Sequence, residues 1–286
     1  MKNVVIAAYA RSPFTPANKG ALARVRPDEL AAQVVRGLLR KSGVDAALMI
    51  HPRGGTRVWR PSLGLVKVKA EFFGKAAHAA SSPWQGANAL NAVIQLFVAL
   101  DALRQQLRPD ARIHGVITHG GDQPNIIPEY TAAEFYLRSE RREYLHELLR
   151  RFEACARAAA TATGCGVNVT PDPQIHDPLK PNLTMSELFR KNLERIGVPE
   201  DPEDPEAGYG STDCGNVSQA IPTIHPYIRI APDGVPLHSR EFAEWAKSPL
   251  ARAGMLAGAK ALALTALDLL ADPDALRQAK AEFART

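Results

Sequence analysis

The 286-residue chain contains only three cysteines, Cys155, Cys165 and Cys214, and none of them forms a C-x-x-C spacing. An odd count without that spacing excludes a disulfide framework and a thiolate zinc site as the basis of the fold. Chains without structural disulfides are typical of reducing compartments. We therefore expect a cytoplasmic protein.

The sequence also lacks a long uninterrupted apolar run. The N-terminal run ends at Arg11 and Pro13, before the apolar core of a signal peptide is complete. The longest C-terminal run, Met255 to Leu270, is interrupted by Lys260 and Asp268. It is shorter than the roughly 20 residues that a membrane-spanning helix needs. We expect a soluble protein with no membrane partner.

The sequence also has no large excess of charge of either sign. Lys and Arg number 35 against 30 Asp and Glu, which leaves a formal charge of +5. A nucleic-acid-binding protein is expected to show a basic stripe or a recognisable module, and this sequence has neither, so nucleic acid is excluded as a partner. The small positive excess favours a small anionic substrate. The length predicts about two domains.

Residues 63–172 carry the clearest pattern of secondary structure. From Leu63 to Phe73 polar and apolar residues alternate, which predicts a half-buried strand with Val66, Val68 and Phe72 on its buried face. The elements that follow are a helix over 88–107, strands over 113–118 and 132–137, a helix over 143–162 and a strand over 166–170. This β-α-β-β-α-β order predicts a ferredoxin-like unit, an antiparallel sheet with two helices on one face.

The flanking segments predict further α/β structure. Val4 to Ala8 predict a buried strand, and Pro27 begins a helix that Gly43 ends. After the central segment the pattern predicts a helix over 184–196 with a capping box made by Thr184 and Glu187. A strand over 221–230 and an Ala/Leu-rich helix over 249–270 complete the prediction.

Six short strings supply the functional signal. They are MIHP at 49–52, FGKAAHA at 73–79, NIIP at 125–128, YLR at 136–138, GSTD at 210–213 and LHSREF at 237–242. In this order and at these separations the strings resemble the co-catalytic metal amidohydrolases and exopeptidases, the aminoacylase and carboxypeptidase-G-like superfamily, and within it the aminobenzoyl-glutamate hydrolase branch. The resemblance covers about residues 44–286.

The resemblance implies an α/β fold in three parts. Residues 44–62 and 173–286 would be the remnant of a two-layer or three-layer metallopeptidase catalytic sheet, truncated at its N-terminal side. Residues 63–172 would be the ferredoxin-like lid that interrupts it, in agreement with the pattern predicted from the residues themselves. Members of the family usually dimerise through this lid, so the resemblance also implies a homodimer.

By the same resemblance, His51 and His238 match metal ligands, and the implied cofactor is a divalent metal, zinc or manganese. His78 matches the lid histidine that reaches the partner subunit's site and donates to the developing oxyanion, a role that lowers the barrier because the charge appears only in the transition state.

Three further positions match the substrate pocket. Asn125 and Arg138 match lid positions that hold the substrate carboxylate, a task suited to the planar guanidinium. Gly210 matches a backbone contact in the same pocket. The implied substrate is a small carboxylate-bearing amide, namely an N-acyl or aminobenzoyl amino acid such as aminobenzoyl-glutamate.

The residues alone leave simpler alternatives open. His51 precedes a proline and is equally compatible with a plain loop residue, and Arg138 can instead pair with Glu134 or Glu140 on the surface. Asp213 and Cys214 are interpreted as loop packing. The remaining histidines carry no local metal-ligand spacing and are interpreted as structural or surface groups, namely His114, His119, His146, His176 and His225.

Several ligand motifs of the resembled family are absent from this sequence. It contains no Cys-Gly-His, no His-x-Asp and no Glu-Glu pair, so most metal ligands and the general-base glutamate are missing. Two histidines do not hold a two-metal centre, and we expect weak or no metal binding and impaired hydrolysis. Alternatives are a non-catalytic dimerisation or binding module, a chimeric gene product, and a hydrolase that takes its missing ligands from another chain.

Residues 1–43 carry a different resemblance. The strings MKNVVIAAYARSPF at 1–14, GAL at 20–22, RPDEL at 26–30 and SGV at 42–44 resemble the N-terminus of thiolases, the acetyl-CoA acetyltransferase family. None of the three cysteines lies in a thiolase-like catalytic motif, so no thiolase chemistry is implied. The sequence therefore predicts a thiolase-like β-α unit joined to a truncated hydrolase.

Overall fold

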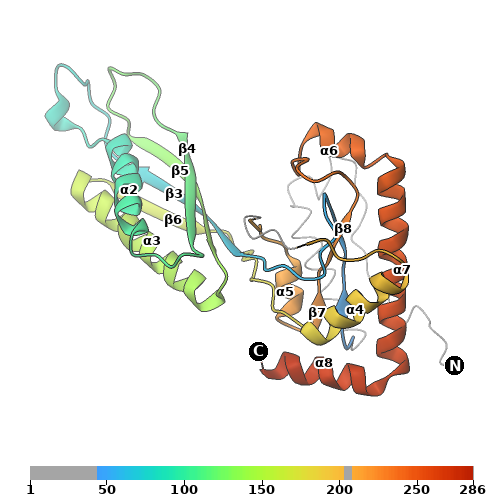
Figure 1. The fold of residues 1–286 in the computed structure, drawn as a ribbon. Helices are drawn as coiled ribbons and strands as arrows, with labels where there is room; N and C mark the ends of the chain where they lie inside the picture. The colour runs from blue at the N-terminus through green and yellow to red at the C-terminus, as the bar shows by residue number, and fades with distance from the viewer. Residues whose placement is uncertain (1–43, 203–207, 286) are drawn as a thin grey trace, which may run out of the picture. The chain divides into compact units, whose positions relative to one another are not determined.

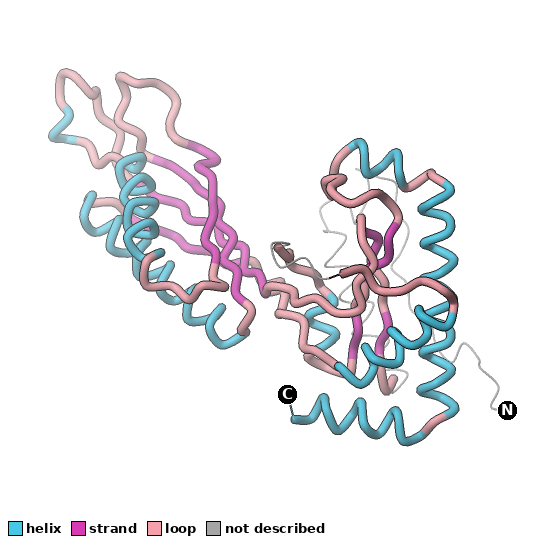
Figure 2. Tube along the Cα trace, viewed as in Figure 1, coloured by secondary structure: helices cyan, strands magenta, loops and turns pink. Residues whose placement is uncertain are grey.

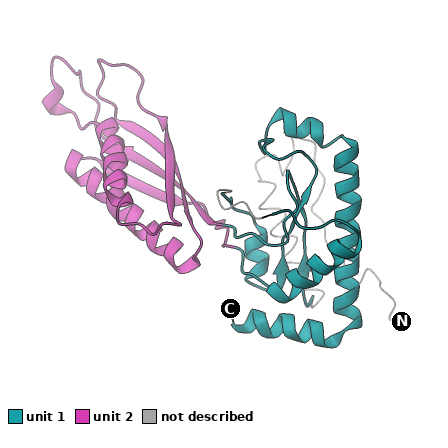
Figure 3. Ribbon diagram, viewed as in Figure 1, with its two compact units in different colours: residues 1–62, 179–286 teal, residues 63–178 magenta. Residues whose placement is uncertain are grey.

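The computed structural model describes residues 44–202 and 208–285, which belong to two compact units (Figure 3). Unit 2 is Leu63–Pro178, and unit 1 consists of the chain on either side of it. Unit 2 ends later than the boundary predicted at residue 172, because His176 and Leu65 still exchange backbone hydrogen bonds of 2.8 and 3.0 Å. The β-α unit predicted for residues 1–43 lies outside the described residues.

Unit 2 has the predicted β-α-β-β-α-β order. Its sheet is antiparallel with strand order β4-β5-β3-β6, and α2 and α3 lie together on one face (Figures 1 and 2). The ferredoxin-like arrangement is thereby confirmed. The elements are β3 (Gly64–Phe73), the short 3-10 helix η1 (Pro83–Gln85), α2 (Ala89–Arg104), β4 (Arg112–His119), β5 (Tyr130–Ser139), α3 (Arg142–Thr163) and β6 (Gly166–Pro171).

The alternation along β3 determines which face of this sheet is buried. Val66, Val68 and Phe72 are at most 2% exposed and belong to the core shared with α2 and α3, as predicted. Lys67 and Lys69 lie on the opposite, partly exposed face. The two helices bury one face of the sheet, and this burial holds the four strands in one register. A slip of one residue would move the buried apolar side chains to the exposed face and the polar ones into the core.

Unit 1 contains two short parallel strand pairs. β1 (Ala47–Leu48) pairs with β7 (Thr223–Ile224), and β2 (His51–Arg53) pairs with β8 (Tyr227–Arg229). The single strand predicted over 221–230 is therefore two strands, interrupted at His225 and Pro226. The physical reason is that Pro226 has no N–H group to continue a strand ladder. The pair β2–β8 places His51 directly opposite Tyr227.

Helices pack around these strands. The helices are α4 (Leu183–Arg195), α5 (Cys214–Ser218), α6 (Arg240–Trp245), α7 (Pro249–Ala271) and α8 (Pro273–Arg285). The sequence analysis predicted α4 with another cap, predicted α7, and did not predict α5, α6 or α8. The cap of α4 is Asn182 rather than Thr184, and its side chain accepts a hydrogen bond of 3.0 Å from Met185 N. Glu282 from α8, a helix the sequence analysis did not predict, accepts the N–H groups of Leu183 and Thr184.

Helix α7 is longer than the apolar run that we judged too short to span a membrane, because it begins at Pro249. By length and composition alone it is long enough to cross a bilayer, and 28% of its most apolar window is buried. Core helices of soluble proteins pass the same test. Gly254 and Gly258 let α7 approach the strands closely, since a Cβ on Gly258 would lie 2.8 Å from Ile50 Cδ1.

Candidate active site

Three rings gather on one face of the β2–β8 pair. His51 and Tyr227 are opposite each other in register, and their ring centroids are 5.5 Å apart. His225 precedes Tyr227 by two residues, and its ring lies 5.6 Å from His51 and 5.3 Å from Tyr227. The fold thus assembles a two-imidazole centre from segments far apart in the sequence.

The hydrogen bond of His51 determines which of its ring nitrogens is available. His51 Nδ1 lies 2.8 Å from the carbonyl oxygen of Pro52. A carbonyl only accepts, so Nδ1 carries the proton and Nε2 keeps its lone pair. This is the tautomer in which Nε2 can accept a proton or coordinate a metal ion.

His225 is the less conventional member of the pair. The side chain is 2% exposed, and neither ring nitrogen has a hydrogen-bond partner among the described residues. Burial, with the adjacent His51 as the second cause, lowers the pKa of His225 to about 4. The ring is therefore neutral at neutral pH. Buried polar groups without a partner are rare in folded proteins and point to a missing ligand or to function.

Cys214 lies near this centre but is not a nucleophile. It is buried and contacts the sulfur of Met49. Burial, together with the neighbouring Asp213, raises the pKa of the Cys214 thiol to about 12. A thiol with this pKa is protonated at neutral pH and unreactive, which agrees with a packing role, but Cys214 packs as the first residue of α5 rather than in a loop.

The other predicted unit 1 residues lie on exposed loops. His238 follows β8 with φ of 62°, the one positive φ at a non-glycine residue in the described chain. Histidine is among the residues that tolerate this left-handed region. No hydrogen bond or ring contact joins His238 to His51 within the described ranges. Gly210 is exposed, and nothing lies within 4 Å of the position that a Cβ would take.

The described residues do not fit a two-metal centre. Within residues 44–202 and 208–285, no group of three or more His, Cys, Asp or Glu side chains converges on a common point. His51 and His225 offer imidazole nitrogens, but no carboxylate of the described chain joins them in such a group. Because each metal of such a centre requires about three protein ligands, we derive no catalytic step through metal.

A pocket of about 400 Å³ is lined by residues between 53 and 60 and by the loop over 233–237, and none of the three rings is in its lining. One wall is the segment that follows His51, with Arg53, Arg57 and Arg60, and the opposite wall is the loop over 233–237, which ends next to His238. Arg53 reaches back to the centre, since its guanidinium carbon lies 5.2 Å from the centroid of Tyr227.

In unit 2, the structure brings His78 and Asn125 together in two loops beside the ends of β3 and β5. His78 pairs with Ile126 in an isolated bridge, and Ala79 N donates to the carbonyl of Asn125 at 3.0 Å. His78 Nδ1 accepts from two backbone N–H groups, of Ala80 and Ser81, each at 3.2 Å. In the neutral ring the proton is therefore on Nε2, which makes Nε2 a hydrogen-bond donor.

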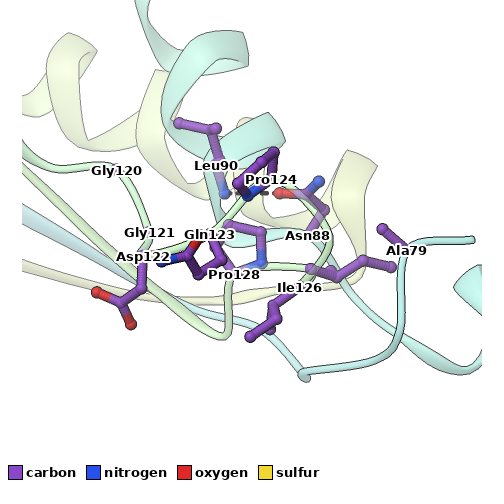
Figure 4. A pocket seen from close by; sticks show the side chains of 11 residues that line it. Ala79, Asn88, Leu90, Gly120, Gly121, Asp122, Gln123, Pro124, Ile126 and Pro128 are labelled. Carbon is purple, nitrogen blue, oxygen red and sulfur yellow. Dashed lines mark hydrogen bonds between the residues drawn. The ribbon is translucent and has the colours of Figure 1, made fainter.

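These loops border a pocket of about 300 Å³, shown in Figure 4. Gln123, Pro124 and Ile126 line it from the loop before β5, and Asn88 and Leu90 line it from the start of α2. The Asn88 side chain is occupied in capping α2, where it accepts from Leu90 N at 2.9 Å. The pocket is therefore lined mainly by backbone and apolar groups.

Arg138 is not near Asn125 in the same chain. It lies toward the far end of β5, roughly 26 Å along the strand from Tyr130 at about 3.3 Å per residue. One lid therefore does not place both side chains on a single carboxylate. Arg138 Nε instead donates to His114 Nε2 at 3.2 Å, and burial, with Arg138 as the second cause, lowers the pKa of His114.

The sequence analysis interpreted His225 and His114 as structural or surface groups and did not single out Tyr227 or Arg53. The signal that connects Arg53 with His51 is alternation, because residues two apart on a strand share a face, whereas His225 lies outside β8. That signal becomes useful only when β2 is known to pair with β8. His114 is likewise recognisable only from its register opposite Tyr136, next to Arg138.

Comparisons with known proteins agree with this organisation. Residues 62–163 match the M20 peptidase dimerisation domain. The chain is 38% identical to the Xaa-Arg dipeptidase of Mus musculus over 84% of its own length and 56% of that protein. It is 25% identical to one of the two p-aminobenzoyl-glutamate hydrolase polypeptides of Escherichia coli over 84% of its length and 61% of that protein.

A solved structure shares the fold. The crystal structure of a protein described as an aminohydrolase from methicillin-resistant Staphylococcus aureus superposes with a TM-score of 0.67 at 20% identity, covering 85% of this chain and 63% of that one. This chain thus spans less than two thirds of the proteins that it matches. Nothing in the comparisons supports a thiolase part or a chimera.

Proposed function

We propose that the chain forms a homodimer through residues 62–163, which match the M20 peptidase dimerisation domain, and binds small amides that carry a carboxylate. The proposal includes impaired hydrolysis. The observation that carries it is the coexistence of a complete lid with an imidazole pair that has no carboxylate beside it among the described residues.

The edge of the lid sheet supports dimerisation. β4 is the edge strand next to β5, and Val116 and Ile117 on it are 60% and 38% exposed. On α2, Ile94 and Val98 lie one turn apart and are 43% and 54% exposed. An exposed apolar edge strand is a template for pairing with another chain. A second copy of the lid would cover these side chains.

A dimer would also give the lid residues a role. His78 and Asn125 are exposed, and the His78 ring presents its Nε2 proton outward from the loop. By the resemblance, a donor in this position serves an oxyanion in the partner subunit's site. We therefore assign His78 and Asn125 to the partner subunit's substrate, and Arg138 to a separate carboxylate contact.

Hydrolysis is impaired in this account because a positioned base is missing. General-base catalysis contributes a factor of about 10²–10⁴, and neither a Glu-Glu pair in the sequence nor a described carboxylate beside His51 supplies it. The relatives' names suggest two substrates to test, an Xaa-Arg dipeptide and p-aminobenzoyl-glutamate. The alternative is a module that dimerises without binding such amides.

Equilibrium dialysis with p-aminobenzoyl-glutamate, combined with light scattering on the full chain, separates these two interpretations. The proposal predicts a dimer that binds the compound, with hydrolysis absent or slow. A dimer without binding would favour the non-catalytic module. A monomer without binding would contradict the proposal.

A further inference from the structure

Three side chains of the lid meet on the sheet face opposite α2 and α3. His114 of β4 is the strand partner of Tyr136 on β5, and Arg138 follows two residues later on the same face of β5. The His114 and Tyr136 rings meet edge-on with their centroids 5.5 Å apart. The guanidinium carbon of Arg138 lies 5.7 Å from the centroid of the same tyrosine ring.

One hydrogen bond joins the two basic side chains of this group. Arg138 Nε lies 3.2 Å from His114 Nε2. A guanidinium only donates, so His114 Nε2 is the acceptor, and the neutral ring carries its proton on Nδ1. The Arg138 guanidinium is thus held by the imidazole at Nε and by the face of the Tyr136 ring.

The surroundings keep His114 in the form that accepts this bond. Partial burial lowers the pKa of His114, and the positive charge of Arg138 lowers it further. The imidazolium form would carry a proton on Nε2 and would no longer accept from Arg138. At neutral pH the two side chains are therefore a neutral acceptor and a cation, rather than two cations that repel each other.

The orientation of the Arg138 guanidinium matters for the function proposed above. A guanidinium binds a carboxylate best through two parallel N–H groups, which requires that the two planes be aligned. With Nε committed to His114, bidentate pairing with a carboxylate is restricted to the two Nη groups. A side chain that holds Nε therefore determines the direction from which a carboxylate can approach.

We propose that His114 is a positioning residue for Arg138, in which role its imidazole fixes the guanidinium plane against Tyr136 and presents it to the carboxylate of a small amide. The inference rests on the proposed function, which assigns a carboxylate contact to Arg138. It adds that binding depends on a hydrogen-bond acceptor at position 114. His114 itself does not touch the substrate in this account.

Nuclear magnetic resonance on the full chain with labelled histidine tests the pairing without a substrate. The His114 signal is identified by its loss in His114→Gln. We expect an unprotonated Nε2 at neutral pH and a pKa below the ordinary 6.5, which should rise in Arg138→Gln. The matched control is Arg112→Gln, because Arg112 is the strand partner of Arg138 but donates to the carbonyl of Ala111 at 2.8 Å. It should move the pKa of His114 less.

Calorimetric titration with p-aminobenzoyl-glutamate then tests the positioning role. His114→Gln keeps an acceptor within reach of Arg138 and should bind as the wild type does. His114→Leu removes the acceptor and should raise the dissociation constant by about fivefold or more, the effect expected for a lost hydrogen bond to a charged group. Arg138→Gln should weaken binding at least as much as His114→Leu.

The inference is overturned if His114 Nε2 is protonated at neutral pH, if Arg112→Gln and Arg138→Gln move the pKa of His114 equally, or if His114→Leu binds as the wild type does. Failure of the wild type to bind instead overturns the proposed function, while the His114 signal still decides whether the pair exists. Circular dichroism checks folding. If His114→Leu does not fold, Tyr136→Leu decides the matter, because it removes the other support of the guanidinium and should weaken binding likewise.

Discussion

The buried ring of His225 lies 5.6 Å from that of His51, and both of its nitrogens lack a partner in the described part of the chain. An unmade hydrogen bond of this kind costs about 1–3 kcal/mol of stability. Other buried polar side chains of unit 1, such as Asn182 and Asn192, do have hydrogen-bond partners. The cost therefore falls beside His51, one of the two residues that the sequence resemblance matched to metal ligands.

The first prediction concerns pH. Because the folded-state pKa of His225 is about 4 against an ordinary 6.5, the unfolded chain binds more protons between these values. The free energy of unfolding should then fall as pH drops from about 6.5 to 4, by up to roughly 3 kcal/mol. His225→Gln cannot titrate and should lose this part of the dependence.

Urea unfolding of unit 1 at several pH values measures the effect. Carboxylates titrate in both proteins over the same pH range. The quantity to compare is therefore the difference in the free energy of unfolding between wild type and His225→Gln at each pH. Parallel curves for the two proteins would show that the His225 ring is not held neutral by burial.

The second prediction concerns the lid edge. Val116→Asp places a charge on the exposed side of β4 and should convert the dimer to a monomer, as measured by light scattering at fixed concentration. Met255→Asp on α7 is the matched control, since Met255 is 62% exposed in unit 1. Loss of the dimer in both variants, or in neither, would argue against an interface at β4.

The third prediction concerns the packing of α7. A Cβ on Gly254 would press against the carbonyl group of Arg229 in β8 and lie 3.2 Å from Ile230 Cγ2. Gly254→Ala should therefore destabilise unit 1 by about 1–3 kcal/mol. Gly208→Ala has open space around it and is the control. Equal melting temperatures for the two variants would contradict the close contact between α7 and β8.

The fourth prediction concerns thiol reactivity. With a pKa of about 12 and a buried side chain, Cys214 should react with a disulfide reagent only when unit 1 opens. Cys165 is only partly buried and should react first. Mass spectrometry of the partly labelled protein identifies the site, and early labelling of Cys214 would refute the assignment.

The sequence determined the lid much better than unit 1. In the lid, strands and helices follow each other locally, and alternation such as Val66, Val68 and Phe72 reports the buried face directly. In unit 1 the decisive contacts join residues far apart. Glu282 caps α4 from another helix, and Tyr227 meets His51 only through a parallel pairing that leaves no local pattern.

The residues of the candidate site likewise fall into those that the sequence located and those that it did not. Family strings located His51, His78 and Asn125, and the last two do lie together in the structure. The strings suggested that Asn125 and Arg138 hold the same carboxylate. In the structure Asn125 lies in the loop before β5 and Arg138 near the other end of this ten-residue strand, so the length of the strand keeps them apart. No string pointed to His225 or Arg53, whose positions against the Tyr227 ring are seen only in the structure.

The central proposal is that the four-stranded lid of unit 2 accompanies an imidazole pair with no carboxylate ligand among the described residues, and metal content tests it most directly. Mass spectrometry on the full chain, purified without chelator, should find at most one weakly held divalent ion per chain, with no turnover of p-aminobenzoyl-glutamate. Two tightly bound ions per chain, with turnover that His238→Ala abolishes, would contradict the account.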